Sequence, residues 1–456
     1  MLEWLAQSNY SNNQAIRQSD NQKAVKTNDL HIELPASKSL SNRWLVLNYL
    51  TGSPFVLRNL STADDTLLLQ ALLNQLRHGT SNHFYCHNAG SVARFLLAVL
   101  AITPGQWLLS GDDRLKQRPF SPLIDALRNM GCRIECTEHE GCLPVRITGY
   151  MPQHKMAELD PSASSQFVSA MLLIGPMLPQ GLTLTLTDRP ASRPYIDMTC
   201  TVLNQAGIET SVSPNRRVYR AGTLPSMSHN RNLAVTIERD WSSASYIYAV
   251  AALLPGLRLR MPGLSLSNSC QGDRVTAQIF EHLGVTTREV RSPYRKQVRS
   301  ITVCGTGKPD STLEYNFLDC PDLLPAVVVT CAALGVRARL RGIKNLRIKE
   351  SDRIQALKEE LEKMGGNLTQ TATEIRLAPS TLHPTVPVST HGDHRIAMAF
   401  GVLTLLYPDL VIEEPEQVSK SFPDFWTQLN AIRKTQSQQT KLSQGDFYKS
   451  PRRGEI

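Results

Sequence analysis

Four segments of the chain alternate apolar and polar residues with the period of an amphipathic helix, and each is followed by a glycine. The predicted helices span residues 123–130, 198–206, 275–283 and 354–364. Glycine adopts the left-handed conformation that ends many helices, and strand-like residues follow each of these glycines. Spacings of about 76, 77 and 81 residues favour duplicated α+β units of several strands and two helices over a solenoid. Aspartate-arginine pairs precede three of the helices, at residues 113–114, 273–274 and 352–353.

A second pattern places small polar residues where a loop becomes an apolar helix. Residues 35–43 run from Pro35 through Lys38 and several serines to Arg43, and the apolar positions that follow predict a helix from near Ser39. Ser39 and Arg43 are four residues apart and share a helix face. Free backbone N–H groups, hydroxyls, a lysine and an arginine at one helix start suit a phosphorylated ligand. The alternative is an ordinary serine-capped helix with a solvated basic face.

Two more helix starts repeat this combination. Residues 88–94 lead into an apolar helix, and Gly90 at its start would let a ligand approach the backbone. Residues 162–166 offer hydroxyl and amide donors before another apolar segment. The remaining basic candidates lie singly in small polar motifs and are Arg118, Lys349, Arg353, Arg395 and Lys420. Each motif alone is explained by capping or by a solvated surface charge, but their recurrence indicates an anion pocket.

Composition indicates a soluble globular protein. The chain has 456 residues, 41% apolar and 20% charged, which is enough for two or three domains with a large core. Its apolar runs are shorter than the roughly 18 residues of a membrane span, and the N-terminus lacks a signal-peptide core, so we expect a cytoplasmic protein. The nine cysteines include no Cys-x-x-Cys pair, which disfavours a disulfide framework or a zinc site.

The formal charge of +9 is compatible with nucleic acid, a membrane surface or small polyanions as partners. A nucleic-acid footprint is normally a dense basic stripe, and here the basic residues cluster only in the short tail at residues 449–453. Scattered cations in polar motifs favour a pocket for small anions. Residues 1–28 and 434–456 are polar and are predicted to be poorly ordered extensions.

Taken together, the motifs resemble the 5-enolpyruvylshikimate-3-phosphate (EPSP) synthase family of enolpyruvyl transferases, from about residue 30 to residue 430. The likeness is an ordered series of short motifs: LPASKSLSNR, NAGSVARF, GDDRLKQRP, SASSQF, SRPYID, RDWSSASY, NLRIKESDR, GDHRIAMAF and SKSFPDFW. Helix capping alone would not produce such a series in the family's order.

The resemblance implies an α/β (α+β) fold of two lobes, each built of three βαβαββ units in an inside-out α/β barrel-like arrangement. Lobe 1 would comprise residues 29–36 and 237–433, and lobe 2 residues 37–236. The active site would lie between them. The implied reaction transfers the enolpyruvyl group of phosphoenolpyruvate to the 5-hydroxyl of shikimate-3-phosphate and releases phosphate, on the shikimate pathway to chorismate and aromatic amino acids. We expect a monomer with no cofactor, metal, nucleic-acid partner or membrane contact.

The resemblance also implies two sets of ligands. Those for shikimate-3-phosphate are Lys38, Ser39, Arg43, Ser164, Ser165, Gln166, Ser192, Tyr195, Asp322, Asn345 and Lys349. Those for phosphoenolpyruvate are Lys38, Gly90, Arg118, Gln166, Arg353, Arg395 and Lys420.

Proton transfer in this reaction requires an acid and a base near the methylene carbon, and a base for the hydroxyl proton. Asp322 aligns with the family's aspartate that accepts the hydroxyl proton, Glu350 with its carboxylate for the methyl group, and Lys38 is a candidate acid. Asp319 competes with Asp322 for this assignment, and a loop-capping role is the alternative for Asp322.

Some positions depart from the family pattern. Ala36 replaces a usual glycine, and Phe95 replaces a common proline after Arg94, which leaves the response to the inhibitor glyphosate open. The segment 62–87 is short for a complete unit, so one unit is expected to lack strands.

Two alternatives remain. The related UDP-N-acetylglucosamine enolpyruvyl transferases use a loop cysteine, whereas Gln117 precedes Arg118 here and the loop has no cysteine. A catalytically inactive relative that binds anions or nucleic acid would have lost its carboxylates, but Asp322 and Glu350 are both present.

Overall fold

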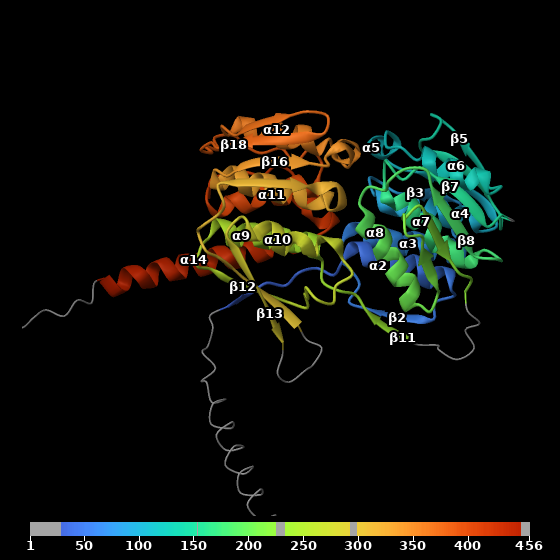
Figure 1. Cartoon of the computed structure of the whole chain (residues 1–456), viewed down its shortest axis with the longest axis horizontal. Coiled ribbons are helices and arrows are strands. Elements are labelled where there is room, and N and C mark those ends of the chain that lie inside the picture. The colour runs from blue at the N-terminus through green and yellow to red at the C-terminus, as the bar shows by residue number, and fades with distance from the viewer. Residues whose placement is uncertain (1–28, 153, 225–232, 292–298, 448–456) are drawn as a thin grey trace, which may run out of the picture.

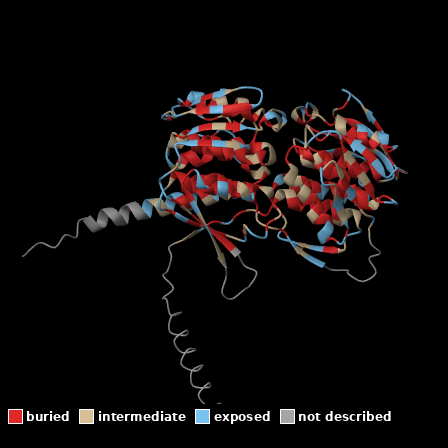
Figure 2. Ribbon diagram, in the orientation of Figure 1, coloured by how far each residue is buried: buried red, intermediate tan, exposed pale blue. Residues whose placement is uncertain are grey.

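Two buried clusters form the cores of two bodies that lie side by side in the computed structural model (Figures 1 and 2). The structure describes residues 29–152, 154–224, 233–291 and 299–447, so the predicted extension 1–28 lies outside the described residues. One cluster contains Ile32, Leu34 and residues from Trp241 to Ile432, and the other runs from Ala36 to Ile237. We call the bodies built on them lobe 1 and lobe 2, respectively.

The chain passes between the two clusters twice, and the two passages pair with each other. Ala36 forms an antiparallel bridge with Arg239, and the N–H of Asp240 donates to the carbonyl of Pro35 at 2.9 Å. We propose that these passages are the predicted crossings between the lobes, because the cluster changes on either side of each one.

Four sheets of four strands repeat one topology, and each contains one parallel and two antiparallel pairings. In lobe 2 the strands are, in spatial order, β3 (His83–Tyr85), β4 (Gly105–Ser110), β6 (Val145–Gly149) and β5 (Arg133–Cys136), then β7 (Met156–Leu159), β8 (Leu182–Leu186), β10 (Val218–Ala221) and β9 (Thr210–Val212). In lobe 1 they are β1 (Leu30–His31), β12 (Arg258–Pro262), β14 (Arg299–Gly305) and β13 (Val285–Arg291), then β15 (Thr312–Asn316), β16 (Arg337–Arg341), β18 (Glu374–Ala378) and β17 (Asn367–Gln370). This repetition explains the glycine spacing in the sequence.

Each complete unit has one apolar helix and one amphipathic helix. The apolar helices are α4 (Gly90–Ile102), α7 (Ser165–Ile174), α9 (Trp241–Leu253) and α11 (Leu324–Leu334). The amphipathic helices are α6 (Ser121–Asn129), α8 (Arg193–Gln205), α10 (Thr276–Glu281) and α12 (Arg353–Lys363). The apolar helices are almost wholly buried because hydrophobic residues surround them on every side. The four glycines predicted to end the amphipathic helices have φ between 76° and 103°, which confirms that prediction.

The third unit of each lobe is reduced rather than a full βαβαββ unit. In lobe 2, α2 (Lys38–Leu50) and α3 (Asp64–His78) accompany a two-stranded parallel sheet of β2 (Phe55–Arg58) and β11 (Leu233–Thr236). In lobe 1, α13 (His394–Gly401) accompanies an isolated parallel bridge between Val388 and Ile412. The expectation of missing strands near residues 62–87 therefore agrees with the structure.

The C-terminal segment differs from its prediction. Helix α14 (Phe425–Phe447) continues through the first part of the tail that we expected to be poorly ordered from residue 434. The polar residues there suit a helix that projects away from lobe 1, as Figure 1 shows. The short elements that complete the fold are α5 (Asp113–Lys116) and the 3-10 helices η1 (Gly175–Met177), η2 (Gly272–Val275), η3 (Phe317–Asp319), η4 (Pro321–Leu323), η5 (Lys344–Ile348), η6 (Val402–Leu405) and η7 (Pro415–Lys420).

Candidate active site

A polar cavity lies between the lobes and collects almost all of the predicted site residues. Its volume is about 840 Å³, including open solvent at its mouth. Lobe 2 lines it with Lys38, Ser39, Asn42, Arg43, Asp65, Ser91, Phe95, Arg118, Ala163, Ser164, Ser165, Gln166, Ser192 and Tyr195. Lobe 1 lines it with Pro321, Asp322, Asn345, Lys349, Glu350, Arg353, His394 and Arg395. Among the predicted site residues, Gly90 and Lys420 are not in the wall of this cavity.

Helix starts bring many of these side chains to the cavity. Ser37 is the cap of α2, which begins at Lys38, one residue before the predicted start, and Leu40 N–H lies 3.5 Å from the Ser37 hydroxyl. Ser164 caps α7 in the same way, with the N–H of Gln166 at 3.2 Å. Capping and cavity lining are therefore not exclusive alternatives, because Ser164 does both.

Arg43 is fixed by the helices around it. Its Nε donates to Thr199 at 2.8 Å, one terminal nitrogen donates to the Ser39 carbonyl at 2.8 Å, and the other donates to Ser169 at 3.0 Å. Burial lowers the pKa of this guanidinium to about 10. Arg43 thus ties α2 to α7 and α8 and still contributes positive charge at the cavity wall.

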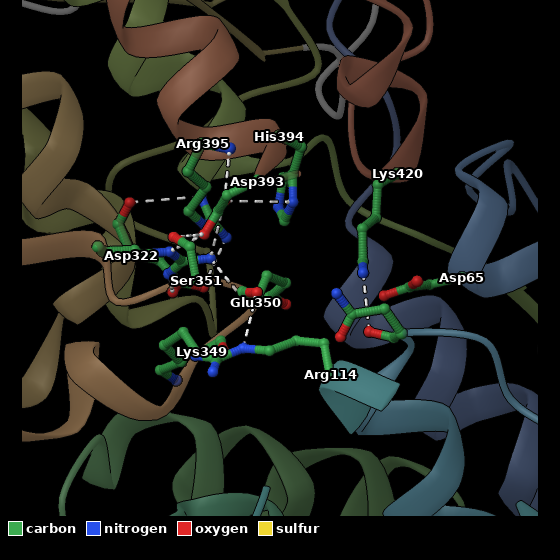
Figure 3. A network of polar contacts seen from close by, with 12 residues as sticks. Asp65, Arg114, Asp322, Lys349, Glu350, Ser351, Asp393, His394, Arg395 and Lys420 are labelled. Carbon is green, nitrogen blue, oxygen red and sulfur yellow. Dashed lines mark hydrogen bonds and ion pairs between the residues drawn. The ribbon is translucent and has the colours of Figure 1, made fainter. Parts of the chain in front are cut away.

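Two arginines of lobe 1, Arg353 and Arg395, bind the carboxylate of Asp322. Figure 3 labels Asp322 and Arg395 in this network. A terminal nitrogen of Arg353 lies 3.0 Å from Oδ1, and one of Arg395 lies 2.5 Å from Oδ2. Burial alone would raise the pKa of Asp322, but Arg395 and Arg353 outweigh it and hold the pKa well below its usual range. Asp319, the competing candidate, lies outside the cavity wall and pairs with Arg193 at 3.4 Å.

Glu350 is also held ionised. Its Oε2 accepts from Arg353 at 2.8 Å, and Arg353 reaches Asp393 as well, at 2.8 Å. Burial would raise the pKa of Glu350, but Arg353 and the nearby Arg118 keep it well below the ordinary value. Arg353 itself is only 1% exposed and joins three carboxylates, so it organises the whole lobe 1 face of the cavity.

Direct hydrogen bonds join the two lobes at residues beside the cavity. Arg114 of lobe 2 donates to the backbone carbonyls of Glu350 at 3.1 Å and Lys349 at 3.0 Å. Asn345 of lobe 1 donates to the Ser162 carbonyl at 3.1 Å, so its side chain also bridges the lobes. Burial lowers the pKa of Lys349 to about 8, which leaves its charge responsive to pH near neutrality.

Gly90 and Lys420 lie next to the cavity but do not line it, and their assignment to phosphoenolpyruvate stays a prediction. A Cβ at Gly90 would lie 2.6 Å from guanidinium nitrogens of both Arg94 and Arg118, so this glycine makes room for two arginines instead of lining the cavity. Lys420 donates to the carbonyl of Asn88 at 2.8 Å and lines a neighbouring cavity with Asp65. Asp65 lines both cavities, so Lys420 lies close to the main one.

Arg118 and Arg94 form a buried cationic pair, and the motif analysis did not assign Arg94. Arg94 donates to Gln166 Oε1 at 2.9 Å and lies over the ring of Phe120, 4.7 Å from its centroid. Arg118 has two buried donor nitrogens, Nε and one terminal nitrogen, that lack partners among the described residues. Burial lowers the pKa of each guanidinium. An anion beside Arg118 would offset this cost.

Asp65 and His394 also line the cavity without having been assigned. Asp65 accepts from Lys38 Nζ at 3.0 Å, so the candidate acid already has a carboxylate partner. The His394 ring is 1% exposed, and burial together with Lys38 and Arg395 lowers its pKa far below the usual value, which keeps it neutral. Asp65 belongs to an acidic pair at a helix start and His394 to the GDHR motif, but only the fold brings both to this cavity.

A group of metal-ligating types lies elsewhere, at Glu359, Glu360 and His391, whose ligand atoms are within 4.8 Å of one another. Glu360 is already neutralised by Lys363, whose Nζ lies 2.7 Å away, so the group is explained as an ion-pair cluster. The prediction that the site needs no metal or cofactor stays untested. Among the described residues, no helix has the length and apolar character to cross a membrane.

Comparison with known proteins agrees with the fold and identifies the family. The family model described as EPSP synthase (3-phosphoshikimate 1-carboxyvinyltransferase) matches residues 23–429. The 3-phosphoshikimate 1-carboxyvinyltransferase of Bacteroides fragilis strain YCH46 is 39% identical over 401 residues, which cover 87% of this chain and 94% of that relative. The one from Syntrophobacter fumaroxidans is 33% identical over 416 residues, covering 87% and 95%.

A solved structure of EPSP synthase from Acinetobacter baumannii has a TM-score of 0.66 and 21% identity, and the match covers 88% of this chain and 95% of that chain. At this identity the likeness supports the fold, and the curated relatives and the family model carry the assignment. The chain therefore belongs to the EPSP synthase (3-phosphoshikimate 1-carboxyvinyltransferase) family.

Proposed function

We propose that the cavity between the lobes is the place where this chain performs the reaction of its family, enolpyruvyl transfer from phosphoenolpyruvate to shikimate-3-phosphate. The observation that supports this most strongly is the juxtaposition of six basic side chains with two arginine-held carboxylates, Asp322 and Glu350. With a phosphate at about −1.5 to −2 and a carboxylate, each substrate brings roughly −2.5 to −3. The basic groups outnumber the three carboxylates of the wall, so the cavity favours anionic substrates. The family model and the named relatives favour this reaction over the UDP-N-acetylglucosamine alternative.

The face from lobe 2 is suited to the phosphate and ring of shikimate-3-phosphate. Hydroxyl and amide groups of Ser164, Ser165 and Gln166 stand at the start of α7, where backbone N–H groups also favour an anion. Lys38 and Ser39 start α2 in the same cavity. We assign the phosphoenolpyruvate side to Arg118, Arg353 and Arg395, which carry forked guanidinium groups suited to carboxylate and phosphate.

Asp322 poses a difficulty for its proposed role as the acceptor of the hydroxyl proton, since a carboxylate with a strongly lowered pKa is a weak base. The two arginines that lower its pKa are also the proposed phosphoenolpyruvate ligands. When an anion takes donors from Arg353 and Arg395, Asp322 loses part of its stabilisation and its pKa rises. Binding of the donor substrate would thus prepare the base for the acceptor hydroxyl.

Glu350 and Lys38 complete the proposed proton transfers at the methylene carbon. Lys38 would deliver a proton as the hydroxyl oxygen adds to the neighbouring carbon, and Glu350 would remove a proton from the resulting methyl group as phosphate leaves. Each side chain comes from a different lobe, so both can face one substrate held between them. The monomeric state and the cytoplasmic location remain predictions.

Phosphate release with both substrates present tests the proposal. We expect release only when phosphoenolpyruvate and shikimate-3-phosphate are supplied together, and none when either is omitted. The inactive alternative predicts no release with both, and salt-sensitive binding of RNA in its place. A variant with Arg118→Ala should raise the KM for phosphoenolpyruvate, and an unaltered KM would contradict the assignment of this arginine.

A further inference from the structure

Asp273 lies behind Asp322 and takes no part in the wall of the cavity. It belongs to η2 in lobe 1 and is 3% exposed. Its Oδ2 accepts hydrogen bonds from the hydroxyls of Tyr195 at 3.1 Å and Ser242 at 2.5 Å. The same Tyr195 hydroxyl lies 3.3 Å from Oδ2 of Asp322. One hydroxyl of lobe 2 therefore stands between two carboxyl groups of lobe 1.

The hydroxyl groups of Tyr195 and Ser242 supply fewer protons than there are hydrogen-bond contacts among these four side chains. Ser242 and Tyr195 each bring one hydroxyl proton, whereas the two carboxyl groups and the two hydroxyls make three contacts at hydrogen-bond distance. If both carboxyl groups were ionised, the Tyr195 proton could be donated to only one of them, and the other contact would place two oxygen lone pairs against each other. A third proton, carried by one carboxyl group, satisfies all three contacts.

The surroundings decide which carboxyl group carries it. Asp322 faces two guanidinium groups within 3.0 Å, which favour its ionised form. Asp273 has no such partner among the described residues, and its Oδ1 is buried without a hydrogen bond. The neighbouring Arg274 turns away and donates to the carbonyls of Leu266 and Ser269. The third proton therefore belongs on Asp273.

The charged and titratable groups around Asp273 agree with this placement. Those that face it are Tyr195 from α8, Asp240 at the start of α9, Tyr315 at β15, Cys320 before η4, Asp322 in η4 and Arg395 from α13. Burial, and then the charge of Asp322, raises the pKa of Asp273 to about 7, although Ser242 and Arg395 oppose the rise. The group can thus change its ionisation near neutral pH.

We propose that Asp273 is a positioning residue that holds a proton, so that Tyr195 donates its own proton to Asp322. This inference rests on the proposed function, in which Tyr195 is a ligand of shikimate-3-phosphate and Asp322 is the base that accepts the hydroxyl proton. Loss of the proton would place a second buried negative charge beside Asp322, and the Tyr195 hydroxyl would then be shared between two anions. The cavity would become less favourable for the anionic shikimate-3-phosphate, while the chemistry of bound substrate would be affected less.

The test compares the wild type with Asp273→Asn, whose amide stays neutral and donates to the Tyr195 oxygen as the protonated acid does. The KM for shikimate-3-phosphate is measured for both proteins from about pH 5.5 to about pH 8.5, either side of a pKa near 7. We expect the ratio of the wild-type KM to the variant KM to be near one at the acid end. It should rise about tenfold at the alkaline end, the effect of one buried charge within about 10 Å at an effective dielectric constant of ~20. Taking the ratio cancels the ionisation of the substrate and of Lys349, since both proteins share them.

Ser242→Ala provides a second variant that still tests the inference if Asp273→Asn does not fold. Removing the Ser242 hydroxyl takes a donor from the ionised carboxylate, so the alkaline rise in KM should move to higher pH. A KM ratio that stays constant over the whole range, or a Ser242→Ala profile that does not move, overturns the inference. Activity at the acid end tests the proposed function separately, because both proteins should release phosphate there.

Discussion

The two faces of the cavity differ in how their charges are paired. The face from lobe 2 presents helix starts with hydroxyls and basic groups, and Asp65 is its carboxylate in the cavity wall. The face from lobe 1 presents a network in which Arg353 pairs with Asp322, Glu350 and Asp393, and Arg395 pairs with Asp322. We propose that the two faces have different roles, in which lobe 2 mainly binds an anion and lobe 1 combines arginines for the second anion with carboxylates for proton transfer.

Among these variants, Glu350→Gln should have the largest effect on the proposed proton transfer by lobe 1. The amide keeps the shape of the side chain but cannot accept a proton, so kcat should fall by roughly 10²–10⁴ while the KM for shikimate-3-phosphate changes little. Steady-state kinetics with each substrate varied in turn would measure the split. Glu362→Gln is the matched control, because Glu362 is about half exposed and pairs with Lys358 on the outer face of α12 at 3.6 Å. Equal effects of the two substitutions would remove Glu350 from the chemistry.

Arg353→Lys should have the next largest effect, since one ammonium group cannot serve three carboxylates and a substrate. We expect the KM for phosphoenolpyruvate to rise by about 10- to 100-fold and the free energy of unfolding to fall by about 3 kcal/mol, the scale for breaking a buried charge network. Kinetics and denaturant unfolding would measure the two effects. As a control, Arg216→Lys in lobe 2 alters an ion pair with Asp197 on the surface. It should change the free energy of unfolding by less than about 1 kcal/mol. An unaltered KM for phosphoenolpyruvate together with an unaltered free energy of unfolding in Arg353→Lys would contradict the claim that Arg353 organises this face of the cavity.

Arg114→Ala sharpens the comparison by weakening the link between the two faces. The substitution removes charge-assisted hydrogen bonds to the carbonyls of Lys349 and Glu350 from across the cleft. Since such bonds contribute about 1.5–3 kcal/mol, kcat/KM should fall by about tenfold or more. Lys116→Ala on the same helix removes an outward ion pair with Glu138 and should leave kcat/KM close to that of the wild type. Indistinguishable kcat/KM values for the two variants would mean that the hydrogen bonds of Arg114 do not position Lys349 and Glu350 for the reaction.

Local patterns in the sequence were sufficient to predict the repeated units and the polar helix starts, whereas Ser192, Tyr195 and Asp322 were named only through the family resemblance. The helix-ending glycines and the polar helix starts are short-range signals, and the structure confirms both. Arg94 also left a local signal, because a charged residue inside an apolar helix needs a partner, which Gln166 supplies. The sequence did not reveal that partner, since it lies 72 positions away.

The features that sequence analysis missed depend on contacts between distant segments. Asp273 was visible as part of a repeated aspartate-arginine pair, but its place beside Asp322 results from how η2 and η4 pack around α9. The sequence also did not show that two guanidinium groups, of Arg94 and Arg118, approach the backbone at Gly90. Helix α14 continues into the tail that was predicted to be poorly ordered, because composition alone does not separate a polar helix from a disordered tail.

Asp322 offers the most direct test of the account, through the single-turnover rate of phosphate release when both substrates are saturating. The account predicts that Asp322→Asn slows this step by roughly 10²–10⁴ while calorimetry shows the binding of shikimate-3-phosphate largely intact. Asp319→Asn, at a nearby carboxylate outside the cavity wall, should release phosphate at nearly the wild-type rate. An unchanged rate in Asp322→Asn would contradict the claim that lobe 1 supplies the proton acceptor.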